Sequence, residues 1–162
     1  MLRTLKNRTA KTGERDKGFT LIELMVVVMI IAVLLAIAIP TFLGSKNKAE
    51  DRSAQSSLRN ALTAAKTIYT DSSDYTKADT TTLAAGEPAL SFVVAGTASG
   101  DAKTISVSTT TSAFYGAAKS KGGTCYYIKD TATAGTTYAK GTGTCDGTTA
   151  AGLTTYTATG WS

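Results

Sequence analysis

An apolar segment dominates the first third of the chain. Residues 24–39 read LMVVVMIIAVLLAIAI, an unbroken apolar run of 16 residues. Further apolar positions extend the run at both ends: Phe19, Leu21, Ile22, Phe42 and Leu43. As one helix, residues 19–43 would be about 37 Å long at about 1.5 Å per residue, enough to cross a hydrocarbon core of about 30 Å. The pattern predicts a helix able to span a membrane.

An amphipathic pattern follows in residues 44–75. Apolar side chains recur there at spacings of three and four, at Ala54, Leu58, Ala61, Leu62, Ala65, Ile68 and Tyr69. This spacing places them on one face of a helix, which we expect to pack on a sheet. The turn-forming residues Asp71-Ser72-Ser73-Asp74 should end the helix. Both segments together predict one N-terminal helix of about 50 residues.

Residues 76–162 are rich in Thr, Ala, Gly and Ser, a composition that favours exposed strands over helices. Five candidate strands are separated by glycine-rich breaks, and they cover residues 90–95, 103–109, 113–118, 124–129 and 136–139. We expect these strands to form one small antiparallel sheet carried on the helix. The predicted fold class is therefore α+β.

The charge of the chain is concentrated in its first 18 residues. The formal net charge is +5, but residues 1–18 hold six Lys or Arg and two acidic residues, so residues 19–162 carry only +1. The basic character belongs to a leader ahead of the apolar segment, not to a nucleic-acid-binding face. Positively charged leaders stay in the cytoplasm, so everything after Leu43 is predicted to be exported.

Three basic residues, Arg52, Arg59 and Lys66, recur every seventh position on a neighbouring face of the second helical segment. Such a stripe can bind DNA or another subunit, but without interleaved aromatic residues a solvated face is the favoured interpretation. We do not expect nucleic acid as a specific ligand.

Export also bears on the two cysteines, Cys125 and Cys145. Thiols outside the cytoplasm can oxidise and remain oxidised, and an even number leaves no thiol over. The topology therefore predicts a disulfide that closes residues 125–145.

An ordinary secretory signal peptide has a similar pattern of a basic segment followed by an apolar one. Ala36-Ile37-Ala38 imitates the small-x-small cleavage site, and cutting there would release a secreted soluble domain, an enzyme or a binding module. Two features count against this alternative. Glu23 lies at the border of the apolar run, and apolar residues continue beyond the cut to Leu43.

The string Gly18-Phe19-Thr20-Leu21-Ile22-Glu23-Leu24 lies between the basic leader and the apolar helix. In this position it resembles the N-terminal motif of the type IV pilin and pseudopilin family. The resemblance implies that a prepilin peptidase cuts between Gly18 and Phe19 and then N-methylates Phe19. The resemblance is close over residues 17–43 and extends in general pattern to about residue 75. Beyond residue 75 only the architecture is similar.

Glu23 is costly in an apolar helix, at about 2.5 to 3.5 kcal/mol at the bilayer centre and less near an end. The resemblance implies a compensating partner, the α-amino group of Phe19 on a neighbouring subunit, and hence a role in assembly. The alternative is a carboxylate that reaches the lipid headgroups.

Pro40 and Gly44 mark a place where the long helix can kink. The resemblance implies that the helix loosens here when subunits pack into filaments. A simple kink where the helix leaves the membrane is equally compatible with the sequence.

The chain contains no histidine, which removes Ser-His-Asp and Cys-His arrangements and the usual zinc sites. Its acidic residues are scattered along the sequence. We therefore predict no catalytic residues, no metal and no cofactor, and a protein that is not an enzyme.

The resemblance implies a structural subunit built from four regions: a removed leader (1–18), a hydrophobic helix of the membrane and filament core (19–43), its amphipathic continuation (44–75) and a β domain (76–162). We expect the major pilin of a type IV pilus, a filament with adhesion, motility and DNA uptake as its alternative uses, or alternatively a pseudopilin of a type II secretion system. The expected partners are further copies of the chain, the prepilin peptidase, the pilus assembly machinery and cytoplasmic-membrane lipid. The subunit would wait as a single-pass protein of the cytoplasmic membrane, with its N-terminus inside, before it reaches the surface pilus.

Overall fold

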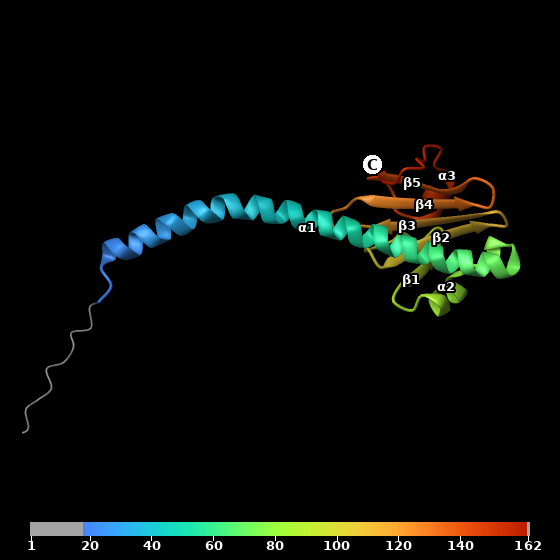
Figure 1. The fold of residues 1–162 in the computed structure, drawn as a ribbon, viewed down its shortest axis with the longest axis horizontal. Helices are drawn as coiled ribbons and strands as arrows, with labels where there is room; N and C mark the ends of the chain where they lie inside the picture. The colour runs from blue at the N-terminus through green and yellow to red at the C-terminus, as the bar shows by residue number, and fades with distance from the viewer. Residues whose placement is uncertain (1–17, 162) are drawn as a thin grey trace, which may run out of the picture. The chain divides into compact units, whose positions relative to one another are not determined.

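The computed structural model describes residues 18–161, so the basic leader predicted for residues 1–18 lies outside the described residues except for Gly18. The described chain forms two compact units, which divide between Thr41 and Phe42. One long helix, α1 (Leu21–Ser72), runs through both units (Figure 1). Its length of 52 residues agrees with the predicted helix of about 50. The fold class α+β is confirmed.

The first unit consists of the apolar part of α1 and the residues just before it. This helix is long and apolar enough to cross a membrane, and none of its most apolar stretch is buried within the chain. Pro40 and Gly44 both lie inside α1, where the backbone remains helical. The kink predicted at these residues remains a prediction.

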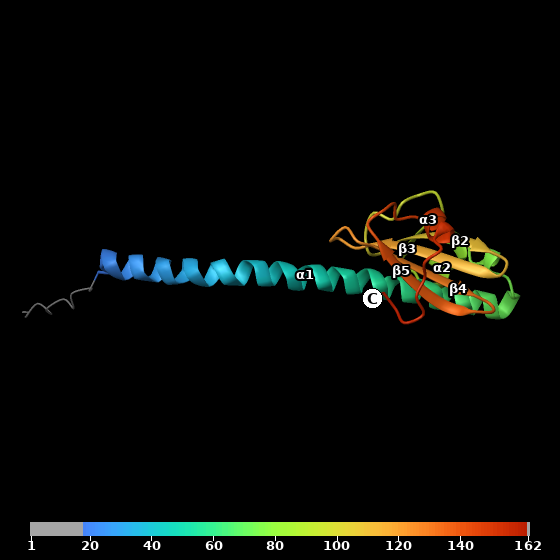
Figure 2. The same cartoon turned by 90° about the horizontal axis from the view of Figure 1, so that it is seen from above.

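The second unit contains a five-stranded sheet in the order β1-β2-β3-β4-β5 (Figure 2). Its strands are β1 (Ser91–Val94), β2 (Thr104–Thr110), β3 (Ala113–Lys119), β4 (Cys125–Thr131) and β5 (Gly135–Gly141). Each one overlaps a predicted strand.

The first strand pair differs from the prediction of an antiparallel sheet. β2, β3, β4 and β5 pair antiparallel in sequence, but β1 pairs parallel with β2, with Ser91 opposite Thr104. The segment between them returns the chain to the end of the sheet where β1 began. There the Asp101 carboxylate accepts hydrogen bonds from the backbone N–H groups of Lys103 and Thr104, both at 2.8 Å, and so fixes the start of β2.

Three short helical segments were not anticipated by the sequence pattern: η1 (Tyr75–Lys77), α2 (Thr80–Gly86) and α3 (Gly147–Gly152). Each begins at an aspartate whose side chain accepts backbone N–H groups of the first turn, namely Asp74, Asp79 and Asp146. Side-chain caps of this kind fix helices that are too short to show a hydrophobic period.

The amphipathic part of α1 packs on the sheet as predicted. Its buried apolar residues are Ala54, Leu58, Ala61, Leu62 and Ala65, and Ile68 and Tyr69 are partly buried against the same core. Gly116 of β3 permits the close approach, because a Cβ atom there would lie 3.2 Å from both Leu58 and Ile128. The helix and the sheet thus share one hydrophobic core.

The basic stripe on α1 is not simply solvated, contrary to the favoured interpretation. The Lys66 ammonium lies 2.8 Å from the Asp130 carboxylate, and the Arg59 guanidinium lies 4.9 Å from the centre of the Trp161 ring. Arg52 is exposed. Two of the three basic residues therefore attach α1 to the rest of its own unit, which the seven-residue spacing alone could not reveal.

The C-terminal residues return to this core. The Trp161 ring meets Tyr126 and Tyr138 edge-on, and its Nε1–H donates a hydrogen bond of 2.8 Å to the Tyr127 carbonyl. A bridge between Tyr138 and Thr157 extends the sheet locally beyond β5. These contacts attach the last residues of the chain to β4, β5 and α1.

Asp130 is the most connected buried charge of the second unit, with 3% of its surface exposed. Its carboxylate accepts hydrogen bonds from the Tyr75 hydroxyl at 2.5 Å and the Thr136 hydroxyl at 2.6 Å, besides pairing with Lys66. Burial acts to raise the pKa of Asp130, but the hydrogen bonds from Lys66, Thr136 and Tyr75 outweigh it and hold the pKa below its ordinary value. The network joins η1, β4 and β5 to α1.

We predict that Asp130→Asn lowers the free energy of unfolding by about 1–3 kcal/mol at pH 7, because charge-assisted hydrogen bonds are lost at a buried site. The folded pKa of Asp130 lies below the unfolded value of about 3.9, so its contribution is complete above about pH 4 and is lost as the pH falls through the folded value. Urea unfolding of the detergent-solubilised chain should therefore show a gap between the two proteins that narrows at low pH. Asp71→Asn, at an exposed carboxylate, is the matched control and should change stability by less than about 0.5 kcal/mol. A gap that is constant with pH would contradict this role of Asp130.

Candidate functional site

The residues before the long helix are open to solvent. Gly18, Phe19 and Thr20 precede α1 in extended or irregular backbone, and all three are exposed. Nothing lies within 4 Å of the position that a Cβ atom would occupy at Gly18. A protease needs an accessible, unstructured peptide bond, and the bond between Gly18 and Phe19 meets that requirement.

Thr20 and Glu23 form a reciprocal cap at the start of α1. The Glu23 carboxylate accepts a hydrogen bond of 2.9 Å from the Thr20 backbone N–H and one of 2.6 Å from the Thr20 hydroxyl. The Thr20 hydroxyl in turn accepts a longer bond of 3.3 Å from the Glu23 backbone N–H. This is the capping-box arrangement, in which a threonine and a glutamate three residues later satisfy each other's free N–H groups.

The cap gives Glu23 a role within its own chain that the sequence analysis missed. The signal was present in the sequence, since Thr20-Leu21-Ile22-Glu23 ahead of an apolar run has the capping-box spacing. A carboxylate in the first turn is also favoured by the helix dipole. Glu23 can therefore be held in place before any partner binds it.

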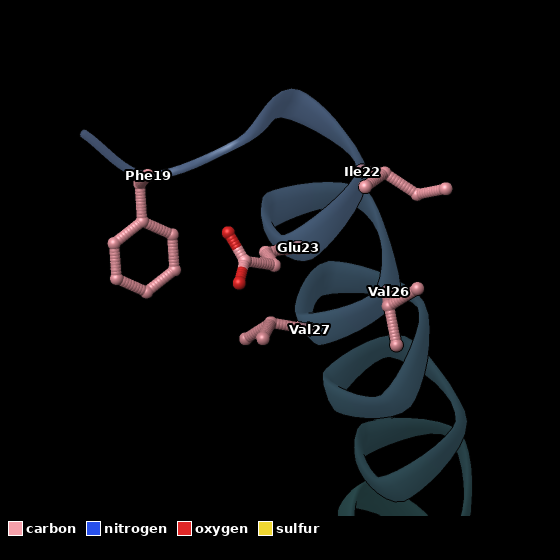
Figure 3. Close-up of a pocket in the computed structure, with 5 residues that line it drawn as sticks. All are labelled: Phe19, Ile22, Glu23, Val26 and Val27. Atoms are coloured by element: carbon pink, nitrogen blue, oxygen red, sulfur yellow. The ribbon is translucent and has the colours of Figure 1, made fainter. Parts of the chain in front are cut away.

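Figure 3 shows the surroundings of this carboxylate. The side chains of Phe19, Glu23 and Val27 lie on one side of the helix, and Ile22 and Val26 project from another. Together these five residues line a shallow, mostly apolar hollow. The Phe19 residue, which is 83% exposed, is only one position ahead of the cap, so cleavage at Gly18 would create a positive α-amino group close to the carboxylate.

The disulfide predicted from the sequence is present between Cys125 and Cys145, whose Cα atoms are 5.4 Å apart. Both cysteines are buried, and they form a small second core with Ala117, Tyr127 and Ala150. The closed segment contains the whole β4–β5 hairpin, so the bond ties the start of this hairpin to the segment before α3. The Tyr127 hydroxyl donates a hydrogen bond of 2.8 Å to the Thr144 carbonyl beside it.

The structure does not bring the predicted residues into one site. Gly18, Phe19 and Glu23 lie at the start of α1, Pro40 and Gly44 lie within it, and the two cysteines lie in the second unit. Within residues 18–161 no group of three or more Cys, Asp or Glu side chains is placed to hold a metal ion. The candidate site is thus the segment from Gly18 to Glu23.

Comparison with known proteins gives this segment a family context. Residues 14–39 match the model of the prokaryotic N-terminal methylation motif. The chain is 40% identical over 68 residues to the type IV major pilin protein PilA of Myxococcus xanthus. These residues make up 42% of this chain and 31% of that pilin. It is also 42% identical over 60 residues to the type II secretion system core protein G of Pectobacterium carotovorum. These residues make up 35% of this chain and 38% of that protein.

A third relative is the type IV wide pilus major component PilA4 of Thermus thermophilus, 40% identical over 60 residues that cover 37% of this chain and 46% of that protein. The chain thus spans about a third to under half of the length of these relatives. No solved structure matches it. The resemblance to the type IV pilin and pseudopilin family is confirmed, and it rests on the methylation motif and the relatives that share it.

We predict that Cys125→Ser with Cys145→Ser lowers the free energy of unfolding by about 3 kcal/mol, because the bond restricts an unfolded loop of about 20 residues. Urea unfolding and limited proteolysis of the solubilised chain measure the change, and reduced unaltered protein is the control that should behave like the double variant. Thiol labelling of denatured, unreduced protein should find no free thiol. Two labelled cysteines would contradict the bond, and unchanged unfolding would contradict its stabilising role.

Proposed function

We propose that this protein is the major subunit of a type IV pilus-like filament, made as a membrane-anchored precursor and polymerised through α1. The observation that carries the proposal is the methylation motif at an exposed Gly18–Phe19 bond, immediately before a helix whose apolar side chains are all exposed between Leu21 and Leu43 in the single chain. Apolar surface of this extent must be covered by lipid or by other protein. The two states of a pilin, in the membrane and in the filament, supply these two environments in turn.

The proposed course begins with the precursor in the cytoplasmic membrane, its basic leader inside and its second unit outside. Prepilin peptidase removes residues 1–18 and N-methylates Phe19. The assembly machinery then transfers the helix from lipid into a bundle of identical helices. Pro40 and Gly44 would allow α1 to bend or loosen between its two halves during this transfer.

Glu23 has the assembly role in this proposal. In the bundle its carboxylate would pair with the α-amino group of Phe19 on a neighbouring copy, which would otherwise be a second unpaired charge in an apolar environment. Removing one partner of a buried pair costs several kcal/mol, about 3–5 in soluble proteins, so the pair selects the register in which both charges are satisfied. The Thr20 cap supports this role because it orients the carboxylate beforehand.

A pseudopilin of a type II secretion system is the second candidate, favoured by the similarity to the core protein G of Pectobacterium carotovorum. The buried disulfide favours the pilus, since a C-terminal cysteine pair is more typical of pilins. Release of a soluble domain by a cut after Ala38 is less well supported, because α1 continues as a helix across this position. Neither candidate requires a cofactor or an enzymatic activity.

We predict that the mature chain begins at N-methylated Phe19, because this bond combines the motif with an accessible backbone. Intact-mass and N-terminal peptide spectrometry of the exported protein measure the new terminus, with chain from cells without prepilin peptidase as the control. A terminus at Ile39 would instead identify a secreted soluble domain and overturn the proposal.

We predict that Glu23→Ala and Glu23→Gln both leave membrane insertion intact but reduce filament yield at least about tenfold, since each removes a charge whose loss leaves the Phe19 amine unpaired. The two variants separate charge from capping, because glutamine can retain the capping box and alanine cannot. Thr20→Ala, which keeps the charge and loses the cap, is the control with the milder expected loss. Filaments are counted by electron microscopy of sheared surface material, and normal yield from Glu23→Gln would contradict the charge pair.

A further inference from the structure

Charged side chains of the second unit gather at opposite ends of its part of α1. One end, called here the basic end, carries six exposed basic residues: Lys46, Lys48, Arg52, Lys103, Lys119 and Lys121. The acidic residues among them are Glu50, Asp51 and Asp101, so positive charge predominates. The acidic end is the last turn of α1 and the segment after it, with Asp71, Asp74 and Asp79 against Lys77.

Contacts within the second unit place the basic residues together. The turn between β3 and β4 lies beside α1 (Figures 1 and 2), and a Cβ atom at Gly122 would be 3.9 Å from side-chain atoms of Asn47 and Asp51. Lys121 of this turn and Lys46 of α1 line one hollow, together with Leu43, Asn47 and Glu50. A second hollow brings Lys103 and Lys121 to the same region.

The charges at the two ends are not neutralised by ion pairs among residues 18–161. Among the described residues the one ion pair is that between Lys66 and Asp130, which belongs to neither end. At the acidic end Asp74 and Asp79 cap η1 and α2 through hydrogen bonds from backbone and threonine groups, which lower the pKa of each carboxyl. Asp71 is exposed.

Asp71 is also badly placed for the stability of its own helix. It lies in the last turn of α1, where the helix dipole disfavours a carboxylate, and no basic residue in that turn compensates it. A residue that costs the single chain stability fits a contact made with something else. The basic end offers the complementary charge on another copy of the same chain.

We propose that the basic end of one copy rests on the acidic end of the next, so that the second units contact one another end to end along the filament. This inference rests on the proposed function. The two ends are different surfaces of one chain, so the contact is heterologous and does not close on itself, which is the geometry that generates open helical filaments. Lys46 and Asp71 are about 37 Å apart along α1 at about 1.5 Å per residue, and this sets the approximate axial offset of contacting copies.

The contact also complements the apolar core. Packing of apolar helices is non-directional and tolerates sliding, whereas opposite charges outside the core select a partner and a register and steer copies together at low salt. Exposed pairs of this kind are individually weak and are screened by salt. The end-to-end contact would therefore make filament formation salt-sensitive without being its main source of affinity.

Charge reversal tests the contact in full-length chains expressed with their assembly machinery. Lys46→Glu with Lys121→Glu reverses the basic end, and Thr70→Lys with Asp71→Lys reverses the acidic end. Each double variant is expected to reduce filament yield about fivefold or more, and the combination of all four changes should restore it to within about twofold of the unaltered chain. Lys77→Glu is the matched control for single Lys121→Glu, because it makes the same charge change at the acidic end and should not reduce yield.

Folding is measured on the same solubilised variants. Asp71→Lys should leave the melting temperature unchanged or raise it, since a cation replaces an anion at the helix C-terminus, while it lowers filament yield. If a multiple variant fails to fold, single Lys121→Glu, single Asp71→Lys and their combination decide the matter. The end-to-end contact would be overturned if both double variants gave a normal filament yield, or if combining them did not restore the yield. The proposed function would still stand in either case. No filaments from the unaltered chain, with the bond between Gly18 and Phe19 still uncut, would overturn the proposed function as well.

Discussion

The fold depends on how one helix buries apolar surface in two different ways. Between Ala54 and Ala65 the apolar residues of α1 occupy one face, and the sheet covers that face within the same chain. Between Leu21 and Leu43 they occupy every face, and nothing among residues 18–161 covers them. In one half of α1 the apolar side chains are thus covered within the same chain. In the other half they are left to be covered by lipid or by further copies.

Because of this division, the second unit is stabilised by strong contacts among its own segments. The Asp130 network, the buried disulfide and the contacts of Trp161 all join distant segments to α1 or to the β4–β5 hairpin. Attachments that span α1, the sheet and the C-terminus hold this unit together without any contribution from the apolar half of α1.

Charge acts at three levels of this structure. Buried charge at Asp130 stabilises the single chain, because both carboxylate oxygens accept from neighbouring donors: Tyr75, Thr136 and Lys66. Charge at Glu23 is held at a helix start by its own cap, where it is available to a partner. Exposed charge that caps no helix or strand, such as that of Lys46, Lys121 and Asp71, contributes little to the stability of the second unit and is free to contact another copy. The contacts that each charge makes within its own chain thus indicate whether it acts within a chain or between chains.

The sequence by itself determined the long helix, the five strand positions, the α+β class, the cysteine pair and the processing motif. Except for the cysteine pair, which follows from export and an even number of thiols, these features depend on local period, composition and a short string of residues, all of which are properties of neighbouring positions. Only the tertiary structure decided that β1 runs parallel to β2, that Lys66 meets Asp130 and that Arg59 covers Trp161. Such pairings join residues far apart in the chain, and their partners are selected by the packing of the whole unit rather than by any local pattern.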